Sequence, residues 1–240
     1  MNEKWDDRTR LLIGESNLEK LRRSTIMIAG LGGVGGYAAE LLCRAGIGNF
    51  ILIDNDIVQP SNRNRQIIAT IETENKLKAE LFLNRLKSIN PEVNVTIIPE
   101  FLNERNIYNI IENFKIDYLV DAIDTLKSKV VLLSATYFRK IPIVSSMGSG
   151  GKLDPSKIKL VDISESYNCK LAYLVRKYLH RKGIYSGIKV VFSPEKVKKD
   201  SVIPCDNAVK KSIIGTISYM PAMFGCYCAY AVINDIINQC

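Results

Sequence analysis

Residues 25–36 read TIMIAGLGGVGG, an apolar run that leads directly into a cluster of glycines. The run TIMIA is typical of a buried strand, and residues 33–45 have the pattern of a helix. The spacing G-x-G-x-x-G is met at the turn between them by Gly30, Gly32 and Gly35, and Gly33 belongs to the same turn. In this motif the glycines allow a tight turn, a close approach of the backbone to phosphate, and packing of the helix on the strand. Because the helix start presents free N–H groups to an anion, the turn indicates nucleotide binding.

Short apolar runs alternate with helical patterns throughout the first 150 residues. The patterns predict strands at 25–29, 50–53, 93–98, 118–120 and 141–145, and helices at 33–45, 76–89, 104–113 and 125–139. Such alternation predicts a Rossmann-like, doubly wound α/β fold, with a mostly parallel sheet and helices on both faces. Because crossovers are right-handed, the loops that follow the strands meet at one edge of this sheet.

The pattern loosens after residue 151. It predicts strands at 158–161 and 188–192, helices at 171–179 and 218–238, and a mobile, irregular loop at 193–211. The last helix is apolar nearly all round, so we expect it to be buried in the core or between subunits. We therefore expect one domain over 1–240, with a nucleotide-binding core at 1–150 and an αβ extension at 151–240.

The composition is that of an ordinary globular protein. Its 240 residues are 47% hydrophobic and 24% charged, which excludes a collagen, a disulfide miniprotein and a wholly disordered chain. The start of the chain is charged, and the longest apolar run, at 220–233, is shorter than the roughly 20 residues of a membrane span. The six cysteines form no C-x-x-C pair. We therefore expect a cytoplasmic protein with reduced thiols, no zinc site and no membrane segment.

The net charge of +8 belongs to one region of the chain. Residues 152–211 contain 14 Lys/Arg and 6 Asp/Glu, a difference of +8, whereas the other residues contain 19 of each type. Localised positive charge fits a polyanionic partner such as nucleic acid. It fits a solvated, lysine-rich surface equally well, so charge alone leaves both interpretations open.

A dense polar segment, DNDIVQPSNRNRQ at 54–66, follows the second predicted strand. Asp54 stands where a carboxylate binds a ribose hydroxyl in such folds. An NAD-dependent dehydrogenase needs only this acid, whereas arginine with asparagine and glutamine suits the oxygens of a triphosphate. Lys78 opens a helix and Asp124 follows a strand, both at the same predicted sheet edge, where an acid can hold Mg²⁺ beside phosphates.

These motifs resemble the adenylation domain of ubiquitin-activating-type enzymes, molybdopterin-synthase adenylyltransferase and the thiamine-pathway adenylyltransferase. That family uses ATP to convert a carboxylate into an acyl-adenylate and releases pyrophosphate. The resemblance implies an ATP site built by the glycine turn together with Asp54, Asp56, Asn62, Arg65, Gln66 and Lys78. In it Asp54 would bind the ribose, Asn62, Arg65 and Lys78 the phosphates, and Asp124 the magnesium.

The resemblance also implies a catalytic set that includes a residue near the N-terminus. In the family an N-terminal arginine reaches the ATP of the neighbouring subunit in a homodimer, and Arg10 matches it. The implied catalytic residues are therefore Arg10, Arg65, Lys78 and Asp124. The extension at 151–240 would then bind the substrate and form the dimer.

Within this family the chain is similar to the threonylcarbamoyladenosine tRNA dehydratases. The narrower match rests on DND at 54–56, NRNRQ at 62–66, KLKAE at 76–80, INPE at 89–92, DAID at 121–124, GGKLDP at 150–155 and VVFS at 190–193. It implies ATP-dependent activation of the side-chain carboxylate of that modified base, which then cyclises with overall loss of water. The tRNA would contact basic residues of the extension, namely Arg176, Lys177, Arg181, Lys182, Lys196, Lys198 and Lys199.

Several alternatives remain open at this point. The adenylated substrate can instead be the C-terminus of a ubiquitin-like sulfur-carrier protein, and a monovalent cation or sulfur-transfer partner proteins can take part. An NAD-dependent oxidoreductase is another alternative, but for that function the sequence offers no obvious proton-transfer group, since His180 is the only histidine. A basic RNA-binding module without catalysis is a further alternative. Cys205 is either a nucleophile that forms a thioester or an incidental loop cysteine.

Overall fold

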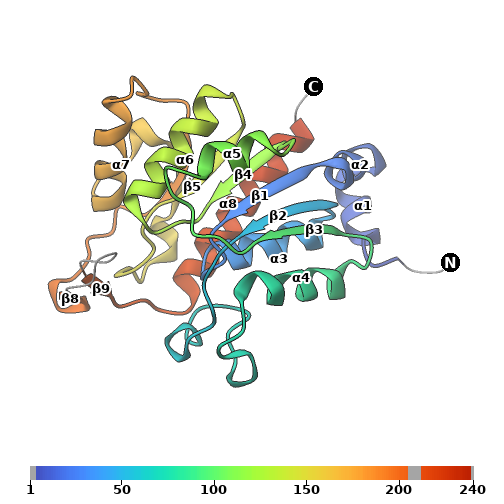
Figure 1. The fold of residues 1–240 in the computed structure, drawn as a ribbon, viewed down its shortest axis with the longest axis horizontal. Coiled ribbons are helices and arrows are strands. Elements are labelled where there is room, and N and C mark those ends of the chain that lie inside the picture. The colour runs from blue at the N-terminus through green and yellow to red at the C-terminus, as the bar shows by residue number, and fades with distance from the viewer. Residues whose placement is uncertain (1–3, 205–211, 239–240) are drawn as a thin grey trace.

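A seven-stranded sheet organises the chain, of which the computed structural model describes residues 4–204 and 212–238 (Figure 1). The strand order is β3-β2-β1-β4-β5-β7-β6. Every neighbouring pair is parallel except β6 and β7. The strands are β1 (Thr25–Ala29), β2 (Asn49–Ile53), β3 (Asn94–Ile98), β4 (Tyr118–Asp121), β5 (Ile143–Ser146), β6 (Lys159–Asp162) and β7 (Lys189–Phe192). This topology confirms the predicted Rossmann-like α/β fold with a mostly parallel sheet.

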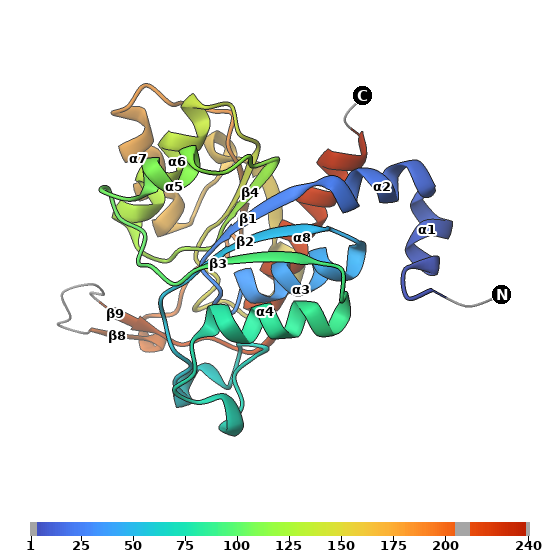
Figure 2. The same ribbon diagram turned by 45° about the vertical axis from the view of Figure 1, so that its right-hand side comes forward.

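Helices cover both faces of the sheet (Figure 2). One face carries α2 (Glu15–Arg23), α3 (Gly35–Ala45), α4 (Lys78–Ile89) and α8 (Tyr219–Asn238), and the other α5 (Ile107–Glu112), α6 (Leu126–Phe138) and α7 (Lys170–His180). Successive strand residues point to opposite faces, so Ile26 and Ile28 of β1 enter the first core whereas Met27 and Ala29 enter the second.

The long apolar helix α8 belongs to the core, which is one of the two places that the sequence left open. It packs against α3 so closely that a Cβ at Gly225 would lie 2.6 Å from the carbonyl oxygen of Val34. By length and composition α8 is also the one helix, among the described residues, that could cross a membrane. Half of its most apolar 18-residue window is buried inside the protein, which is typical of the core helix of a folded domain.

The predicted irregular loop at 193–211 contains regular structure, so that expectation is wrong in part. Its residues 202–204 form β8 (Val202–Pro204), which pairs antiparallel with β9 (Ser212–Ile214) in a separate two-stranded sheet. Two further elements without a sequence prediction, α1 (Asp7–Ile13) and α2, precede the first strand. They lie at the end of the sheet opposite to β8 and β9 (Figure 2).

Candidate active site

The loops after β1, β2 and β4 converge at the carboxyl edge of the sheet. These strands are adjacent and parallel, and the strand order reverses between β1 and β4, which is the usual ligand-binding place in such sheets. We call this place, above the carboxyl ends of β1, β2 and β4, the crevice. Hydrogen bonds of 2.8 Å from Gly30 N to Ile53 O and from Ala122 N to Ala29 O join the three loops. The glycine turn therefore sits on a fixed backbone frame.

The glycines of this turn have distinct roles. Gly30 has a φ of +90°, and a Cβ there would lie 2.9 Å from the carbonyl oxygen of Ala122. A Cβ at Gly35 would lie 1.8 Å from the carbonyl oxygen of Gly30, a distance that no side chain tolerates. Gly33 packs against Pro221 of α8, with 2.9 Å between the two Cβ positions. At Gly32 the nearest atom to a Cβ would be 3.8 Å away, so this position leaves room at the turn for a ligand.

Asp54 connects the glycine turn to Lys78. Its carboxylate accepts hydrogen bonds from the backbone N–H groups of Leu31, at 2.6 Å, and of Asp56, at 2.8 Å. Burial raises the pKa of Asp54, and the charge of Lys78 and the two hydrogen bonds oppose this rise. The buried Lys78 ammonium donates to the exposed Asp56 carboxylate at 2.8 Å. The structure thus brings these three predicted residues together beside the turn.

Arg65 and Asp124 form the other side of the crevice. The Arg65 guanidinium donates to the carbonyl oxygen of Ser61 and to Oδ1 of Asn64, both at 2.8 Å. Burial lowers the pKa of Arg65, and the negative charge of the exposed Asp124 opposes this, because the two groups are close. The buried Asn62 accepts the backbone N–H of Gln59 at 3.0 Å and so shapes the loop that carries Arg65.

Gln66 carries a buried acceptor that the described part of the chain leaves unsatisfied. The residue is 7% exposed, and its Oε1 atom has no hydrogen-bond partner. Its Nε2 atom would lie 3.8 Å from a Cβ placed at Gly32 of the turn. Because a buried polar atom without a partner is costly, this acceptor fits a donor group of a bound molecule, such as a nucleotide hydroxyl or amino group.

A buried ion pair that the sequence analysis did not assign supports the loop of Asp124. Lys129 of α6 is fully buried and donates to Asp121 Oδ2 at 2.6 Å, and Ser145 Oγ donates to the same oxygen at 2.6 Å. The other carboxylate oxygen, Asp121 Oδ1, accepts the backbone N–H of Ile123 at 3.1 Å. This network fixes the residues between β4 and Asp124. The signal available in the sequence was a lysine within an apolar predicted helix that directly follows the DAID motif.

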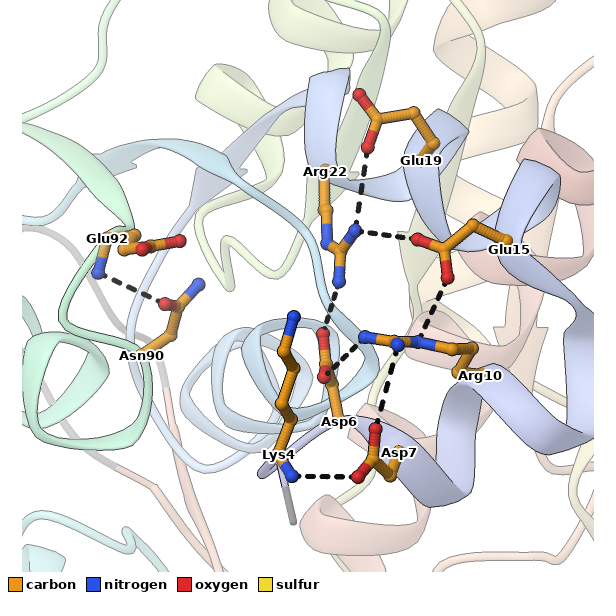
Figure 3. Close-up of polar contacts among 9 residues, drawn as sticks. All are labelled: Lys4, Asp6, Asp7, Arg10, Glu15, Glu19, Arg22, Asn90 and Glu92. Carbon is orange, nitrogen blue, oxygen red and sulfur yellow. Dashed lines mark hydrogen bonds and ion pairs between the residues drawn. The ribbon is translucent and has the colours of Figure 1, made fainter. Parts of the chain in front are cut away.

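Arg10 lies away from this crevice, at the opposite edge of its own sheet. Figure 3 shows it in an ion-pair network of α1 and α2. Its guanidinium contacts Glu15 at 3.0 Å and Asp6 at 3.4 Å, and Asp6 also binds Arg22 at 2.6 Å. Burial alone would raise the pKa of Asp6, but Arg22 and Arg10 hold it below its ordinary value. The structure therefore does not bring Arg10 together with Arg65, Lys78 and Asp124 of the same chain.

The basic residues assigned to tRNA lie in two places, namely in or directly after α7 and in the segment after β7. Helix α7 ends at His180, and the exposed Arg181 and Lys182 follow it. Arg176 is half-buried and turns inward, because it donates to the carbonyl oxygen of Ser166. Lys177 is exposed on the helix.

The remaining tRNA-assigned lysines come from the segment after β7. Lys196 and Lys198 are exposed, and Lys199 begins the short 3-10 turn Lys199–Ser201. Cys205, for which the sequence left open a nucleophile or an incidental loop cysteine, lies outside the described residues. The four described cysteines, Cys43, Cys169, Cys226 and Cys228, are free thiols. Burial raises the pKa of Cys43 and of Cys228 to about 12, so these two thiols stay protonated near neutral pH.

Known proteins resemble this chain over nearly its whole length. The tRNA threonylcarbamoyladenosine dehydratase of Bacillus subtilis (strain 168) is 36% identical over 228 residues, which cover 88% of this chain and 89% of that protein. The crystal structure of the E. coli tRNA N6-threonylcarbamoyladenosine dehydratase TcdA in complex with ATP aligns with a TM-score of 0.87 and 31% identity, over 96% of this chain and 93% of that chain.

A different type of enzyme matches only part of the chain. The adenylyltransferase and sulfurtransferase MOCS3 of Drosophila virilis is 37% identical over 141 residues, which are 59% of this chain and 30% of that protein. The model of the ThiF family, in contrast, matches residues 7–239. With the family model spanning almost every described residue, and relatives above 30% identity covering most of both chains, this chain belongs to the ThiF family.

Proposed function

We propose that this chain is an ATP-dependent tRNA threonylcarbamoyladenosine dehydratase. The observation that carries the proposal is the convergence of Asp54, Arg65, Lys78 and Asp124 around the glycine turn. This convergence occurs in a chain that is similar to such dehydratases over most of its length. The similar E. coli TcdA structure is a complex with ATP. In this chain, the unsatisfied Oε1 atom of Gln66 fits a nucleotide bound beside the glycine turn.

The reaction has two steps. In the first, a carboxylate oxygen of the threonyl side chain bonds to the α-phosphorus of ATP while the bond to pyrophosphate breaks. In the second, a nitrogen of the same side chain bonds to the activated carbonyl carbon, AMP leaves, and the nitrogen loses its proton. The ring closure is intramolecular, so its high effective concentration makes a protein nucleophile unnecessary.

The proposed role of each residue follows from its charge and its position. Asp54 and Gln66 would bind the adenosine end beside the turn, whereas Arg65 and Lys78 would hold phosphates and offset the charge that develops at phosphorus. Asp56 keeps Lys78 in place through its 2.8 Å ion pair, and Asn62 shapes the Arg65 loop. Asp124 would hold Mg²⁺, which prefers one or two carboxylates combined with phosphate oxygens and which would neutralise phosphate charge.

We further propose that Arg10 acts on a neighbouring subunit in a homodimer. Two observations support this: α1, which carries Arg10, lies at the end of the sheet opposite to β8 and β9 (Figure 2), and Leu11 and Leu12 beside Arg10 are 86% and 85% exposed. Mixing the inactive variants Arg10→Ala and Arg65→Ala would then create mixed dimers with one intact site. Recovered activity in the mixture supports action in trans, and no recovery with proven subunit exchange contradicts it.

The direct test is nucleoside analysis of tRNA. Purified protein is incubated with ATP, Mg²⁺ and tRNA that carries threonylcarbamoyladenosine, and the digested nucleosides are separated by mass spectrometry. The proposal requires a product that is lighter by one water and depends on ATP. If folded protein forms no such product, but a ubiquitin-like sulfur carrier stimulates exchange of pyrophosphate into ATP, the alternative adenylyltransferase activity is correct.

Three further assignments belong to this proposal. We assign the segment 151–240 to substrate binding and dimer formation, and the free thiols of the described cysteines fit a cytoplasmic location. A monovalent cation and sulfur-transfer partners remain additions to be tested by ion replacement and by co-purification.

A further inference from the structure

Helix α7 and the turn after it present an unusual outer surface, which we call the α7 face. It consists of exposed basic and tyrosine side chains, namely Lys170, Tyr173, Lys177, Tyr178, Arg181 and Tyr185. Tyr173 is 57% exposed and Tyr185 is 63% exposed, values far above those of core aromatics. The exposed large hydrophobic residues of the segment 170–189 are all tyrosines.

The α7 face follows the helical repeat. Lys170, Tyr173 and Lys177 are spaced by three and four residues, so they form one stripe along the helix. The opposite side carries Ala172 and Val175, which are fully buried against the sheet. Because Lys170, Tyr173 and Lys177 are exposed, the basic and aromatic residues are interleaved on the solvent side of α7, which lies at the periphery of the fold (Figure 1).

Aromatic rings and cations contact one another on this face. The guanidinium carbon of Arg181 lies 5.2 Å from the centroid of the Tyr178 ring. The His180 and Tyr185 rings lie 5.0 Å apart, with 41° between their planes. These contacts hold flat π surfaces and positive charges side by side.

The basic side chains of the α7 face form no ion pair with the described carboxylates. The segment 170–189 contains six Lys/Arg and no Asp/Glu, but Lys189 pairs with Asp235 and Arg176 is turned inward, so neither adds to the face. Within the described ranges 4–204 and 212–238, no carboxylate pairs with Lys170, Lys177, Arg181 or Lys182. The N-terminal network differs, because Arg10 and Arg22 there each contact two or more acids.

The start of α7 is close to the carboxyl edge of the sheet. Tyr167, three residues before the helix, packs its ring on Phe192 at the carboxyl end of β7, with 5.6 Å between centroids. The helix then runs toward the amino edge, where β7 begins. A long ligand on the α7 face would therefore extend outward from the side of the molecule that carries the proposed active site.

We infer that the α7 face binds an unpaired segment of the tRNA, with bases stacked on its tyrosines and phosphates held by its lysines and arginine. Single-stranded RNA offers both a charged backbone and exposed base faces, the two features that this surface matches. An acidic protein would use the charges but has no flat bases for the rings. A duplex would offer phosphates while keeping its bases stacked inside. The choice of tRNA as the ligand rests on the proposed function.

The test compares two RNA probes with two sets of variants. One probe is a stem–loop with a loop of seven unpaired nucleotides, and the other is a blunt duplex with the same number of phosphates. Tyr173, Tyr178 and Tyr185 are changed singly and together to Leu, which removes the stacking ring, or to Phe, which keeps it. Tyr108→Leu is the matched control, because Tyr108 is 41% exposed on α5 and also has a cation, Arg139, over its ring at 5.5 Å.

Fluorescence anisotropy gives the dissociation constants. Each lost stack weakens binding of the stem–loop by roughly tenfold, while binding of the duplex changes little. The Phe series and Tyr108→Leu bind the stem–loop as the wild type does. Leu variants that bind the stem–loop with wild-type affinity overturn the inference, and so does an equal loss for both probes. Circular dichroism verifies that each variant is folded.

A parallel assay separates this inference from the proposed function. ATP-dependent dehydration is measured for the same variants over a range of tRNA concentrations. The inference predicts a raised KM for tRNA with an unchanged kcat at saturation. If the wild type does not dehydrate tRNA but the Leu variants bind the stem–loop more weakly than the wild type, the proposed function is wrong and the RNA-binding role of the α7 face is supported. If the wild type dehydrates tRNA and the Leu variants keep the wild-type KM, the surface is wrong and the function stands.

Discussion

The carboxyl-edge crevice and the α7 face use positive charge in opposite ways. Near the crevice, Lys78 and Lys129 are almost wholly buried, and each donates to a carboxylate at 2.8 Å or less. On the α7 face, Lys170 and Lys177 are exposed, and no carboxylate among the described residues pairs with them. A buried, paired cation fixes geometry, whereas an exposed cation attracts a polyanion without fixing its position. If both proposals hold, chemistry and docking occupy separate surfaces of this chain.

The basic region at 152–211 also contains both kinds of cation, those held by contacts within the fold and those exposed to solvent. Lys152 is 3% exposed and donates to the carbonyl oxygens of Ser193, at 2.9 Å, and Glu195, at 2.7 Å. Lys189 donates to Asp235 at 2.7 Å, and Lys157 pairs with Asp154 at 3.1 Å. These lysines serve the fold, so the part of the excess charge that can meet RNA is smaller than the charge count suggests.

The largest expected effect concerns stability. Replacing Lys129 by Met leaves Asp121 charged and buried without its partner, which costs about 3–5 kcal/mol in the free energy of unfolding. The matched change on the α7 face, Lys177→Met, stays within about 0.5 kcal/mol. Denaturant unfolding of both variants measures the difference. Equal stabilities of the two variants would contradict the assigned contrast between a fixing and a docking cation.

The next effect concerns catalysis. If Arg65 faces the developing phosphate charge, as proposed, Arg65→Ala should lower the rate of dehydration by about a hundredfold to a thousandfold with the fold intact. Arg63 is the control, because it lies on the same loop with its Nε donating to the carbonyl oxygen of Pro60. Arg63→Ala should keep the wild-type rate. Similar rates for the two variants would remove the phosphate role of Arg65.

A smaller effect tests the glycine turn. At Gly35 a Cβ would meet the backbone oxygen of Gly30 at 1.8 Å, so Gly35→Ala forces a shift of the turn and costs about 1–3 kcal/mol or more. Gly148→Ala adds the same methyl group at the same edge of the sheet, where no atom lies within 4 Å. Thermal unfolding should show a lowered midpoint for the first variant alone. An unchanged midpoint for Gly35→Ala would show that the turn is not tightly closed.

The smallest effect concerns salt. Lys177→Ala and Lys182→Ala should each reduce the slope of log K against log salt for tRNA by about one phosphate contact. Lys157→Ala should leave this slope unchanged, since Lys157 belongs to the same basic region but is paired with Asp154. Binding titrations at several salt concentrations give the slopes. Unchanged slopes for Lys177→Ala and Lys182→Ala would place the phosphates elsewhere.

The sequence was sufficient for features that depend on local pattern. The strands β1, β2 and β4 are short apolar runs, and the glycine spacing has a direct steric cause, so the sheet edge with Asp54, Lys78 and Asp124 could be predicted. The ends of the helices were harder to predict. Helix α5 spans Ile107–Glu112 rather than 104–113, because residues 104–106 form a turn and not a helix. Helices α1 and α2 have seven and nine residues, too few for a clear apolar repeat.

Features that depend on contacts distant in sequence could not be predicted. The Lys129 network joins α6 to Ser145 of β5, and Arg176 is turned inward by Ser166, ten residues earlier. The ion pairs of Arg10 with Glu15 and Asp6 are local, but their place at the edge opposite to the crevice follows from the entry of the chain into β1. Charge counts carry no information on which lysines are buried, as Lys152 shows.

In the proposed reaction, each cyclisation of the tRNA base consumes one ATP and converts it to AMP and pyrophosphate. A single-turnover reaction with excess enzyme and ATP labelled at the α-phosphate measures this stoichiometry. We expect one AMP for each cyclised nucleoside in the wild type, and formation of both products about a hundredfold to a thousandfold more slowly with Arg65→Ala. Formation of ADP, or cyclisation without an equal amount of AMP, would show that the carboxylate is not activated as an adenylate.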